Sequence, residues 1–103
     1  MSKISLIAKI TAADGKSTDL RDALGRLVAA ADEEDGLEVY SAHAANDEPG
    51  TFYFFELYRD GDALSTHGQS EAMKAAMAAV GECLGGAPEL TMMTPVVAKG
   101  LDL

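Results

Sequence analysis

The sequence predicts an α+β domain in which a four-stranded antiparallel sheet carries two helices on one face. Two observations predict this class. Segments with strand and helix periodicity follow one another in the order strand, helix, strand, strand, helix, strand. A short turn signal separates the two middle strands, which makes them an antiparallel hairpin. The 103 residues are enough for one domain, residues 1–103, with a buried core of its own.

The first half of the chain supplies a strand, a helix and a second strand. Apolar and polar residues alternate over residues 4–11, which is strand periodicity. From about Ser17 onward, apolar residues recur at the spacing of one helical face, and Gly36 is well placed to end that helix. Residues 37–44 form the next predicted strand. The acidic run 32–35 lies at the end of this helix, where the helix dipole disfavours negative charge. We therefore expect these side chains to form a turn that is exposed to solvent.

The second half supplies the remaining elements. A turn signal at residues 46–50 precedes the aromatic-rich run 51–58, the strongest predicted strand. A short helical segment, residues 63–67, leads to a helix over about residues 70–84. Residues 90–98 supply the last strand. This order is the ferredoxin-like βαββαβ pattern.

Apolar residues occupy both faces of the predicted sheet. In the third strand, Phe52 and Phe54 share one face, and Tyr53, Phe55 and Leu57 share the other. Two helices cover only one face, and an uncovered apolar face is an aggregation hazard. We therefore expect a homodimer in which the second face packs against the sheet of an identical subunit.

Composition and charge disfavour several partners. A net charge of −9 provides no basic stripe for nucleic acid and disfavours binding to an anionic membrane surface. The single cysteine, Cys83, excludes an internal disulfide and a cysteine-based zinc site, and we expect a packed, inert thiol. The apolar run at residues 4–9 is too short for a signal peptide or a membrane span, so the cytoplasm is the expected location.

No strong enzymatic motif is present. The sequence has no phosphate-binding loop, no G-x-G-x-x-G, no G-x-S-x-G and no H-E-x-x-H. A nucleotide, a nicotinamide or a structural zinc would each need a motif that is missing. We therefore expect neither a metal nor an organic cofactor.

Two polar residues stand out on otherwise apolar elements. Glu56 shares a strand face with Phe52, Phe54 and Tyr58, where a carboxylate must be paired, hydrogen-bonded or neutralised. It either supports a structural partner or acts as an acid or base that lines a cavity. His67 ends the short helical segment, where it either faces solvent or caps the helix, or exchanges protons near neutral pH.

Three further residues are weaker candidates. His43 lies on the second strand and points to the opposite face from Tyr40, so it lines a site only if one forms on that face. Met73 and Met77 fall at core spacing on the second long helix, where packing is the ordinary role of methionine.

A series of short motifs runs from Asp35 to Ser70. In chain order they are Asp35-Gly36-Leu37, Tyr40, Asp47-Glu48-Pro49-Gly50, Phe54-Phe55-Glu56-Leu57-Tyr58, Asp62-Ala63-Leu64, His67 and Ser70. This series resembles the pattern Glu-x-Gly-x-x-x-Tyr, Asp-Pro-x-x-Phe, Glu-x-Tyr, Ala-x-x-x-His-x-x-Ser of the antibiotic biosynthesis monooxygenase (ABM) domain family, whose members include quinol monooxygenases. The resemblance covers the whole chain in element order and implies a single ABM-like domain that forms a dimeric α+β barrel.

The resemblance also implies an activity. Characterised members include cofactor-independent monooxygenases that oxidise electron-rich aromatic or quinol substrates with dioxygen. An electron-rich phenolic anion can itself reduce dioxygen, so the protein has to supply a dry cavity, a base and hydrogen-bond donors. On this interpretation His67 is the catalytic base, Tyr58 donates a hydrogen bond, and Glu56 orients either partner.

The same interpretation places the substrate between the sheet and the helices. Phe54, Met73 and Met77 are predicted to form its apolar slot, and His43 is a further candidate for substrate binding.

The sequence departs from the family pattern in two places, and two other functions stay open. Glu71-Ala72-Met73 replaces the second histidine and the aromatic residue that often follow the serine, and the absence of tryptophan disfavours the haem-degrading branch. An isomerase of a small polar metabolite would need an anion site, for which Lys9, Arg59 and Lys74 are available. A non-catalytic dimeric ligand-binding or stress protein is the other alternative.

Overall fold

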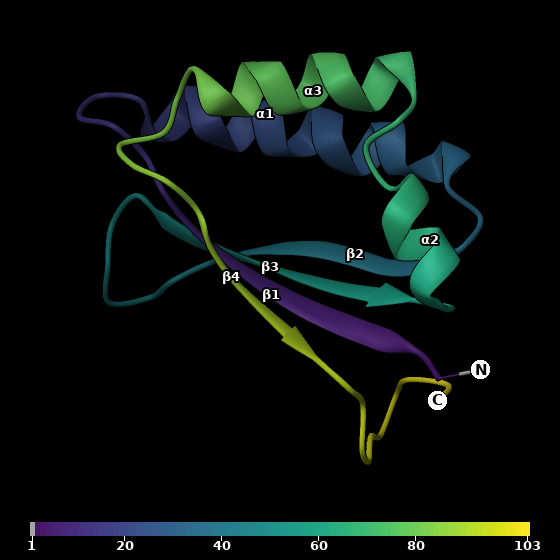
Figure 1. The fold of residues 1–103 in the computed structure, drawn as a ribbon. Helices are drawn as coiled ribbons and strands as arrows, with labels where there is room; N and C mark the ends of the chain where they lie inside the picture. The colour runs from purple at the N-terminus through teal and green to yellow at the C-terminus, as the bar shows by residue number, and fades with distance from the viewer. Residues whose placement is uncertain (1) are drawn as a thin grey trace.

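A computed structural model describes residues 2–103 and places them in two layers (Figure 1). One layer is a four-stranded antiparallel sheet in the order β2-β3-β1-β4, and the two longer helices form the other. In chain order the elements are β1 (Ile4–Thr11), α1 (Ser17–Ala30), the 3₁₀ turn η1 (Ala31–Glu33), β2 (Leu37–Ala44), β3 (Thr51–Tyr58), α2 (Gly61–Thr66), α3 (Glu71–Gly81) and β4 (Glu89–Met93). The predicted ferredoxin-like α+β arrangement is confirmed.

Strand alternation directs one face of the sheet toward the helices. Leu6, Ala8 and Ile10 are buried on that face of β1, opposite alternate residues of β3 that include Phe52 and Phe54. The helices complete the core with Leu20, Ala23, Leu24, Leu27, Met73, Ala76 and Val80. Each fully buried large apolar side chain stabilises the fold by ~1.5–3 kcal/mol, so this core holds the two layers together.

The helices end earlier than the sequence predicts. α1 stops at Ala30 and continues as a 3₁₀ turn, so Gly36 lies beyond the helix and does not end it. α3 ends at Gly81 instead of Leu84, because glycine is a poor helix former and the chain turns there toward β4. α2 begins at Gly61, two residues earlier than predicted.

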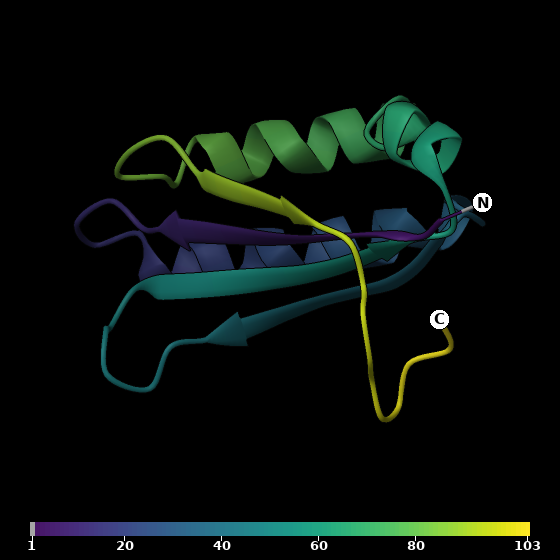
Figure 2. The ribbon, with the colours of Figure 1, turned by 60° about the horizontal axis from the view of Figure 1, so that its bottom comes forward.

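The last strand is shorter than predicted. β4 ends at Met93, whereas the apolar pattern suggested pairing as far as Ala98. Pro95 has no N–H to donate to a strand ladder, which limits pairing beyond β4. The remaining segment, residues 94–103, turns back on the side of the sheet that faces away from the helices (Figures 1 and 2).

The face of the sheet opposite the helices is only partly covered. Tyr53 and Phe55 are half-buried on it, and Ile7 is exposed. Leu57 is fully buried and borders a small hollow that Leu101 of the C-terminal segment also lines. The structure thus leaves apolar side chains of β1 and β3 open on this face.

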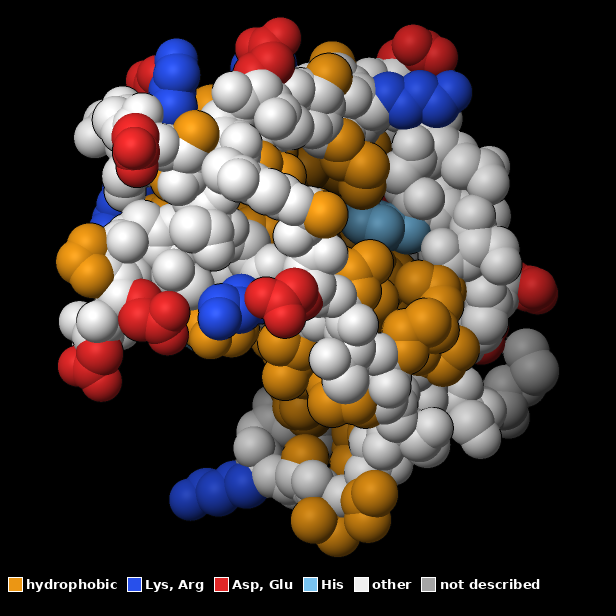
Figure 3. Space-filling view, turned by 60° about the vertical axis from the view of Figure 1, so that its left-hand side comes forward, with side chains coloured by type: hydrophobic (Ala, Val, Ile, Leu, Met, Phe, Trp, Pro, Cys, Tyr) orange, Lys and Arg blue, Asp and Glu red, His pale blue; other side chains and the backbone are white. Residues whose placement is uncertain are grey.

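Hydrophobic side chains also gather at the surface around β4. Figure 3 shows them between the helical layer and the bottom of the molecule. The exposed large hydrophobic residues of β4 and the segment after it are Leu90, Met92, Val96, Val97 and Leu103. No helix among residues 2–103 is long and apolar enough to cross a membrane.

Gly36 allows α2 to approach the start of β2 closely. A Cβ atom at this position would lie 2.5 Å from the Cβ of Ala63, which is buried on α2. The Gly36 carbonyl also accepts a hydrogen bond from the N–H of Arg59, which lies between β3 and α2, at 2.8 Å. Glycine is therefore required here by close approach and not by an unusual backbone angle.

The first prediction concerns this contact. We expect Gly36→Ala to lower the free energy of unfolding by ~1–3 kcal/mol, because α2 has to move away to make room for the methyl group. Gly25→Ala is the matched control. No atom lies within 4 Å of the added Cβ in the middle of α1, so that change should stabilise by ~0.5–1 kcal/mol. Urea unfolding of both variants measures the difference, and equal stability would contradict the assigned contact.

Candidate functional site

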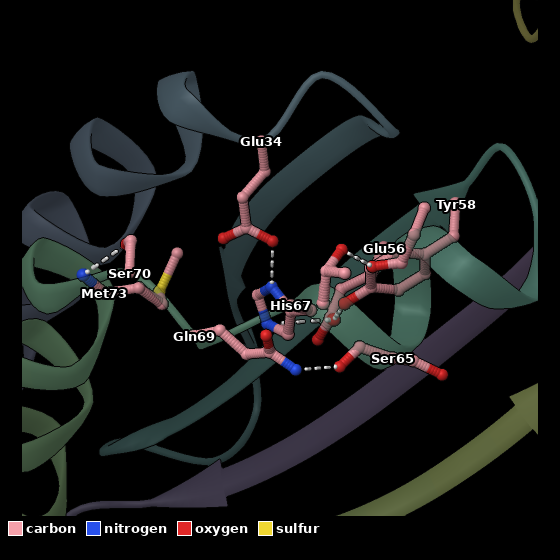
Figure 4. A network of polar contacts seen from close by, with 10 residues as sticks. Glu34, Glu56, Tyr58, Ser65, His67, Gln69, Ser70 and Met73 are labelled. Carbon is pink, nitrogen blue, oxygen red and sulfur yellow. Dashed lines mark hydrogen bonds and ion pairs between the residues drawn. The ribbon is translucent and has the colours of Figure 1, made fainter.

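Side chains from four segments converge on the helix-facing side of the sheet (Figure 4). Glu56 and Tyr58 come from β3, and Tyr40 comes from the neighbouring strand β2, directly opposite Glu56. His67 directly follows α2, and Glu34 directly follows the 3₁₀ turn η1. These five residues are called the His67 cluster below.

Local structure explains how each member of the cluster is positioned. Glu56 and Tyr58 are two residues apart on a strand and therefore share its core face. Asp60 then starts α2, because its carboxylate accepts a hydrogen bond from the Ala63 N–H at 2.9 Å. That bond is the main reason why the pKa of Asp60 lies below its ordinary value. After less than two helical turns, the chain leaves the helix at His67.

Gly68 allows the chain to turn from α2 into α3. Its φ of +85° lies in the left-handed region, which L side chains adopt only with strain. Ser70 then caps α3, because its hydroxyl accepts a hydrogen bond from the Met73 N–H at 3.1 Å. The His67 ring is thus held between two capped helices, directly above the end of β3.

His67 connects Glu34 to Glu56 and Tyr58 through a series of polar contacts. The Nδ1 atom lies 2.7 Å from Oε1 of Glu34, and the Nε2 atom lies 3.9 Å from Oε1 of Glu56. The Tyr58 hydroxyl donates to that same Glu56 oxygen at 2.5 Å. The Nε2–Glu56 separation is too long for a hydrogen bond, so Nε2 keeps a free position for another partner.

Burial changes the acidity of the cluster. Glu56 is only 6% exposed, and its pKa is raised, mainly because burial disfavours the charged form; the Tyr58 hydrogen bond and the nearby His67 oppose this effect. Burial is also the main cause of the raised pKa of Tyr58 and of Tyr40. Both phenols therefore keep their protons at neutral pH, and that of Tyr58 donates to Glu56.

Aromatic rings enclose the histidine. The His67 ring meets Tyr40 and Tyr58 edge to face, with centroid separations of 5.4 and 5.5 Å. Tyr40 also stacks on Phe54 at 4.5 Å. These rings leave the His67 side chain only 13% exposed.

The cluster brings together the three predicted catalytic residues, His67, Tyr58 and Glu56. It does not include His43. That side chain is exposed on the other face of β2, where its Nε2 atom lies 2.9 Å from the Ser41 hydroxyl.

The predicted substrate-binding residues lie in different surroundings. Phe54 is 3% exposed and Met73 is fully buried, so both are part of the core. Met77 is exposed on α3, and its methyl group would lie 3.2 Å from a Cβ added at Gly68, next to His67. A slot formed by these side chains therefore stays a prediction.

A groove lies between α1 and the edge strand β2. It has a volume of about 490 Å³ and is half-open to solvent. Tyr40 and Phe52 line its floor from the sheet, and Arg21 and Val28 line it from α1. Tyr40 is the member of the His67 cluster that borders this groove.

Glu34 belongs to the His67 cluster although the sequence did not predict a role for it. The acidic run was expected to be a solvated turn, and this expectation is right for Asp32, Glu33 and Asp35, which are exposed. It is wrong for Glu34, whose side chain is only 13% exposed and contacts His67. The spacing Glu34-x-Gly36-x-x-x-Tyr40, which fits the first part of the ABM pattern, is the signal that could have identified this residue.

Metal binding has no obvious place in this site. Among residues 2–103, no three His, Cys, Asp or Glu side chains are grouped so that they could hold a metal ion. The arrangement instead suits proton transfer, because a histidine between two carboxyl groups can accept a proton at one ring nitrogen while the other is hydrogen-bonded.

Fold and site together define a small α+β domain with a protected histidine–carboxyl cluster on the helix-facing side of its sheet. The sequence profile described as "Antibiotic biosynthesis monooxygenase" matches residues 3–79. The chain belongs to the antibiotic biosynthesis monooxygenase (ABM) family.

Solved structures agree with this assignment. A candidate antibiotic biosynthesis monooxygenase from Caulobacter crescentus CB15 is 30% identical, with a TM-score of 0.86 over 93% of this chain and 92% of that one. Rv0793 from Mycobacterium tuberculosis and PA3566 from Pseudomonas aeruginosa are each 28% identical to this chain, with a TM-score of 0.84. Each match covers 94% of this chain. It covers 98% of Rv0793 and 97% of PA3566. No curated protein matches the chain.

The second prediction concerns Glu56. Because its pKa is raised in the folded protein, the folded state keeps a proton that the unfolded chain has already released. The free energy of unfolding should therefore fall as pH rises from the ordinary glutamate range, ~4.3, through the raised pKa. Glu56→Gln removes this titration, so its stability should change less with pH across that window.

Urea unfolding at a series of pH values measures how the free energy of unfolding changes with pH in the wild type and in Glu56→Gln. Glu33→Gln removes an exposed carboxyl group from the neighbouring turn and should keep the wild-type slope. The same slope in Glu56→Gln as in wild type would contradict the assigned role of burial.

Proposed function

We propose that this protein is a cofactor-independent monooxygenase that oxidises an electron-rich phenol or quinol with dioxygen. The single observation that carries the proposal is the His67 ring, which is held by Glu34 at one nitrogen while the other has a free position facing Glu56. Membership of the ABM family and the name of the Caulobacter crescentus relative support the same reaction class.

The proposed reaction begins with a proton transfer. His67 accepts the phenolic proton at Nε2, and the resulting anion is electron-rich enough to pass electrons to dioxygen. One oxygen atom becomes a quinone carbonyl at a free ring carbon, and the other leaves as water. A phenol plus O₂ gives a quinone plus H₂O, so the substrate supplies all the electrons and no flavin, nicotinamide or metal is needed.

The other cluster residues would assist this transfer. The Tyr58 hydroxyl already donates a hydrogen bond to Glu56, so its proposed role is to hold that carboxyl group in place. A substrate oxygen between Nε2 and Oε1 of Glu56 can lie within hydrogen-bond distance of both atoms, since they are 3.9 Å apart. In its protonated form, which its raised pKa favours, Glu56 would then donate a hydrogen bond to the substrate oxygen and leave the hydroxyl hydrogen directed toward Nε2.

The isomerase alternative receives less support from the charges. Its phosphorylated or polar substrate would need cations, but Arg59 pairs with Asp60 and Lys74 pairs with Glu71, both at the surface. Lys9 lies on β1 opposite Tyr53, on the face away from the helices. The groups that surround His67 are instead carboxyl groups and phenols.

The third prediction concerns assembly, which we propose to be a homodimer of this single domain. The open face of the sheet exposes Ile7 and leaves Tyr53 and Phe55 half-covered, and a second copy would cover them. We expect twice the chain mass by light scattering at micromolar concentration, with an interface above ~2,000 Å² in total. Ile7→Lys should weaken the dimer, whereas Lys74→Glu on the helix side should not; a monomeric wild type would exclude this assembly.

The fourth prediction separates the two histidines. We expect His67→Ala to lower the rate of oxygen consumption with a dihydroxynaphthalene by ~10²- to 10⁴-fold, the usual contribution of a general base. His43→Ala should keep most of the wild-type rate, because His43 lies on the other face of the sheet. An oxygen electrode measures both rates without added flavin or NADH.

Two controls accompany this comparison. Both variants should elute with wild-type mass, so that a lost rate reports on chemistry and not on assembly. Full activity in both variants would leave His67 structural and would overturn its role as the base. No oxygen consumption by the wild type would instead favour a non-catalytic ligand-binding protein.

A further inference from the structure

We propose that Glu34 is the positioning residue of this site, which fixes the tautomer and orientation of the His67 ring. The inference rests on the proposed function, in which Nε2 of His67 accepts the substrate proton. It adds a role for a residue that lies 33 positions away in the chain and that the proposed reaction itself does not touch.

The contact geometry selects one tautomer. Oε1 of Glu34 lies 2.7 Å from Nδ1 of His67, and both side chains are 13% exposed. An ionised carboxylate can only accept a hydrogen bond, so Nδ1 must carry the hydrogen and Nε2 of the neutral ring must carry the lone pair. Nε2 is the nitrogen that faces Glu56, where the substrate hydroxyl is proposed to lie.

The backbone around Glu34 is fixed on both sides. The Glu34 N–H donates to the Ala31 carbonyl at 2.9 Å, and the Glu34 carbonyl accepts from the Leu37 N–H at 3.1 Å. Gly36 then brings this segment against α2. The carboxylate is therefore presented to His67 from a turn with a fixed backbone, and it approaches the ring at Nδ1, whereas Glu56 lies beside Nε2 (Figure 4).

Stability alone does not account for Glu34. Its second oxygen, Oε2, is buried and has no hydrogen-bond partner among residues 2–103. A buried oxygen without a partner costs free energy, so a purely structural role would favour a side chain that lacks it. An imidazolium formed at His67 during the proposed proton transfer would offset this cost, because it places a positive charge beside the carboxylate.

Ring-nitrogen NMR tests the inference directly. The chain has two histidines, so a His43→Gln background leaves the His67 signals alone in the spectrum. We expect the neutral ring to be protonated at Nδ1 in this protein and to lose that preference in the additional variant Glu34→Ala. Glu33→Gln, which changes the adjacent exposed carboxyl group, should leave the ring signals unchanged.

Kinetics and stability provide the second readout. Glu34→Gln has almost the same shape but no charge. We expect it to lower kcat at least ~10-fold, with a smaller loss than His67→Ala and with little change in KM, since the substrate does not contact Glu34. Its urea midpoint should be unchanged or higher than that of wild type, whereas a structural role for Glu34 predicts a lower one.

The outcomes separate this inference from the proposed function. A His67 ring that is protonated at Nε2 in the wild-type site, or ring signals that do not change in Glu34→Ala, would overturn the inference whatever the activity. If the protein consumes no oxygen with phenols but Glu34 still sets the tautomer, the proposed function fails and the positioning role stands. Wild-type kcat in a folded Glu34→Gln variant would overturn its effect on catalysis.

Discussion

The burial of one carboxyl group, that of Glu56, is the constraint on which the rest of the site depends. The side chain lies on the core face of β3 between Phe54 and Tyr58, where a carboxylate without partners would be strongly destabilising. The Tyr58 hydroxyl supplies a hydrogen bond, and the His67 ring supplies a group that can become positive. Burial nevertheless remains the dominant effect on the pKa of Glu56, so its compensation is incomplete.

This constraint explains why a short extra helix interrupts the simple βαββαβ order. The chain does not run directly from β3 to α3. α2 instead brings the chain back over the strand, with Asp60 at its start and His67 at its end. Its close approach requires glycine at position 36, and its exit into α3 requires the left-handed conformation of Gly68. The backbone of this region is therefore organised around the position of one imidazole ring.

Local pattern was sufficient to predict most of the fold but only part of the site. The bounds of β1, β2 and β3 follow from the alternation of apolar and polar residues and from turn signals. Glu56 was recognisable because a carboxyl group on the apolar face of a strand needs a partner. The end of β4 could not be read from hydropathy, because Pro95 limits pairing without changing the apolar pattern. Glu34 was missed for a different reason. Its partner His67 comes from a distant segment, so a helix-dipole argument that treats each charge alone does not detect the pair.

The charges of the His67 cluster also bear on which substrates the proposed reaction can use. Two carboxyl groups flank the ring, and the neighbouring phenols stay protonated, so an anion that enters from solvent would meet negative charge without a matching cation. A neutral phenol avoids this cost, because its negative charge appears only as His67 becomes positive, and the pair remains neutral in total. The carboxylate of Glu34 then stabilises the imidazolium through its contact with Nδ1. A site with few basic groups is thus better suited to generating a phenolic anion in place than to capturing one, which agrees with the acidic composition of the whole chain.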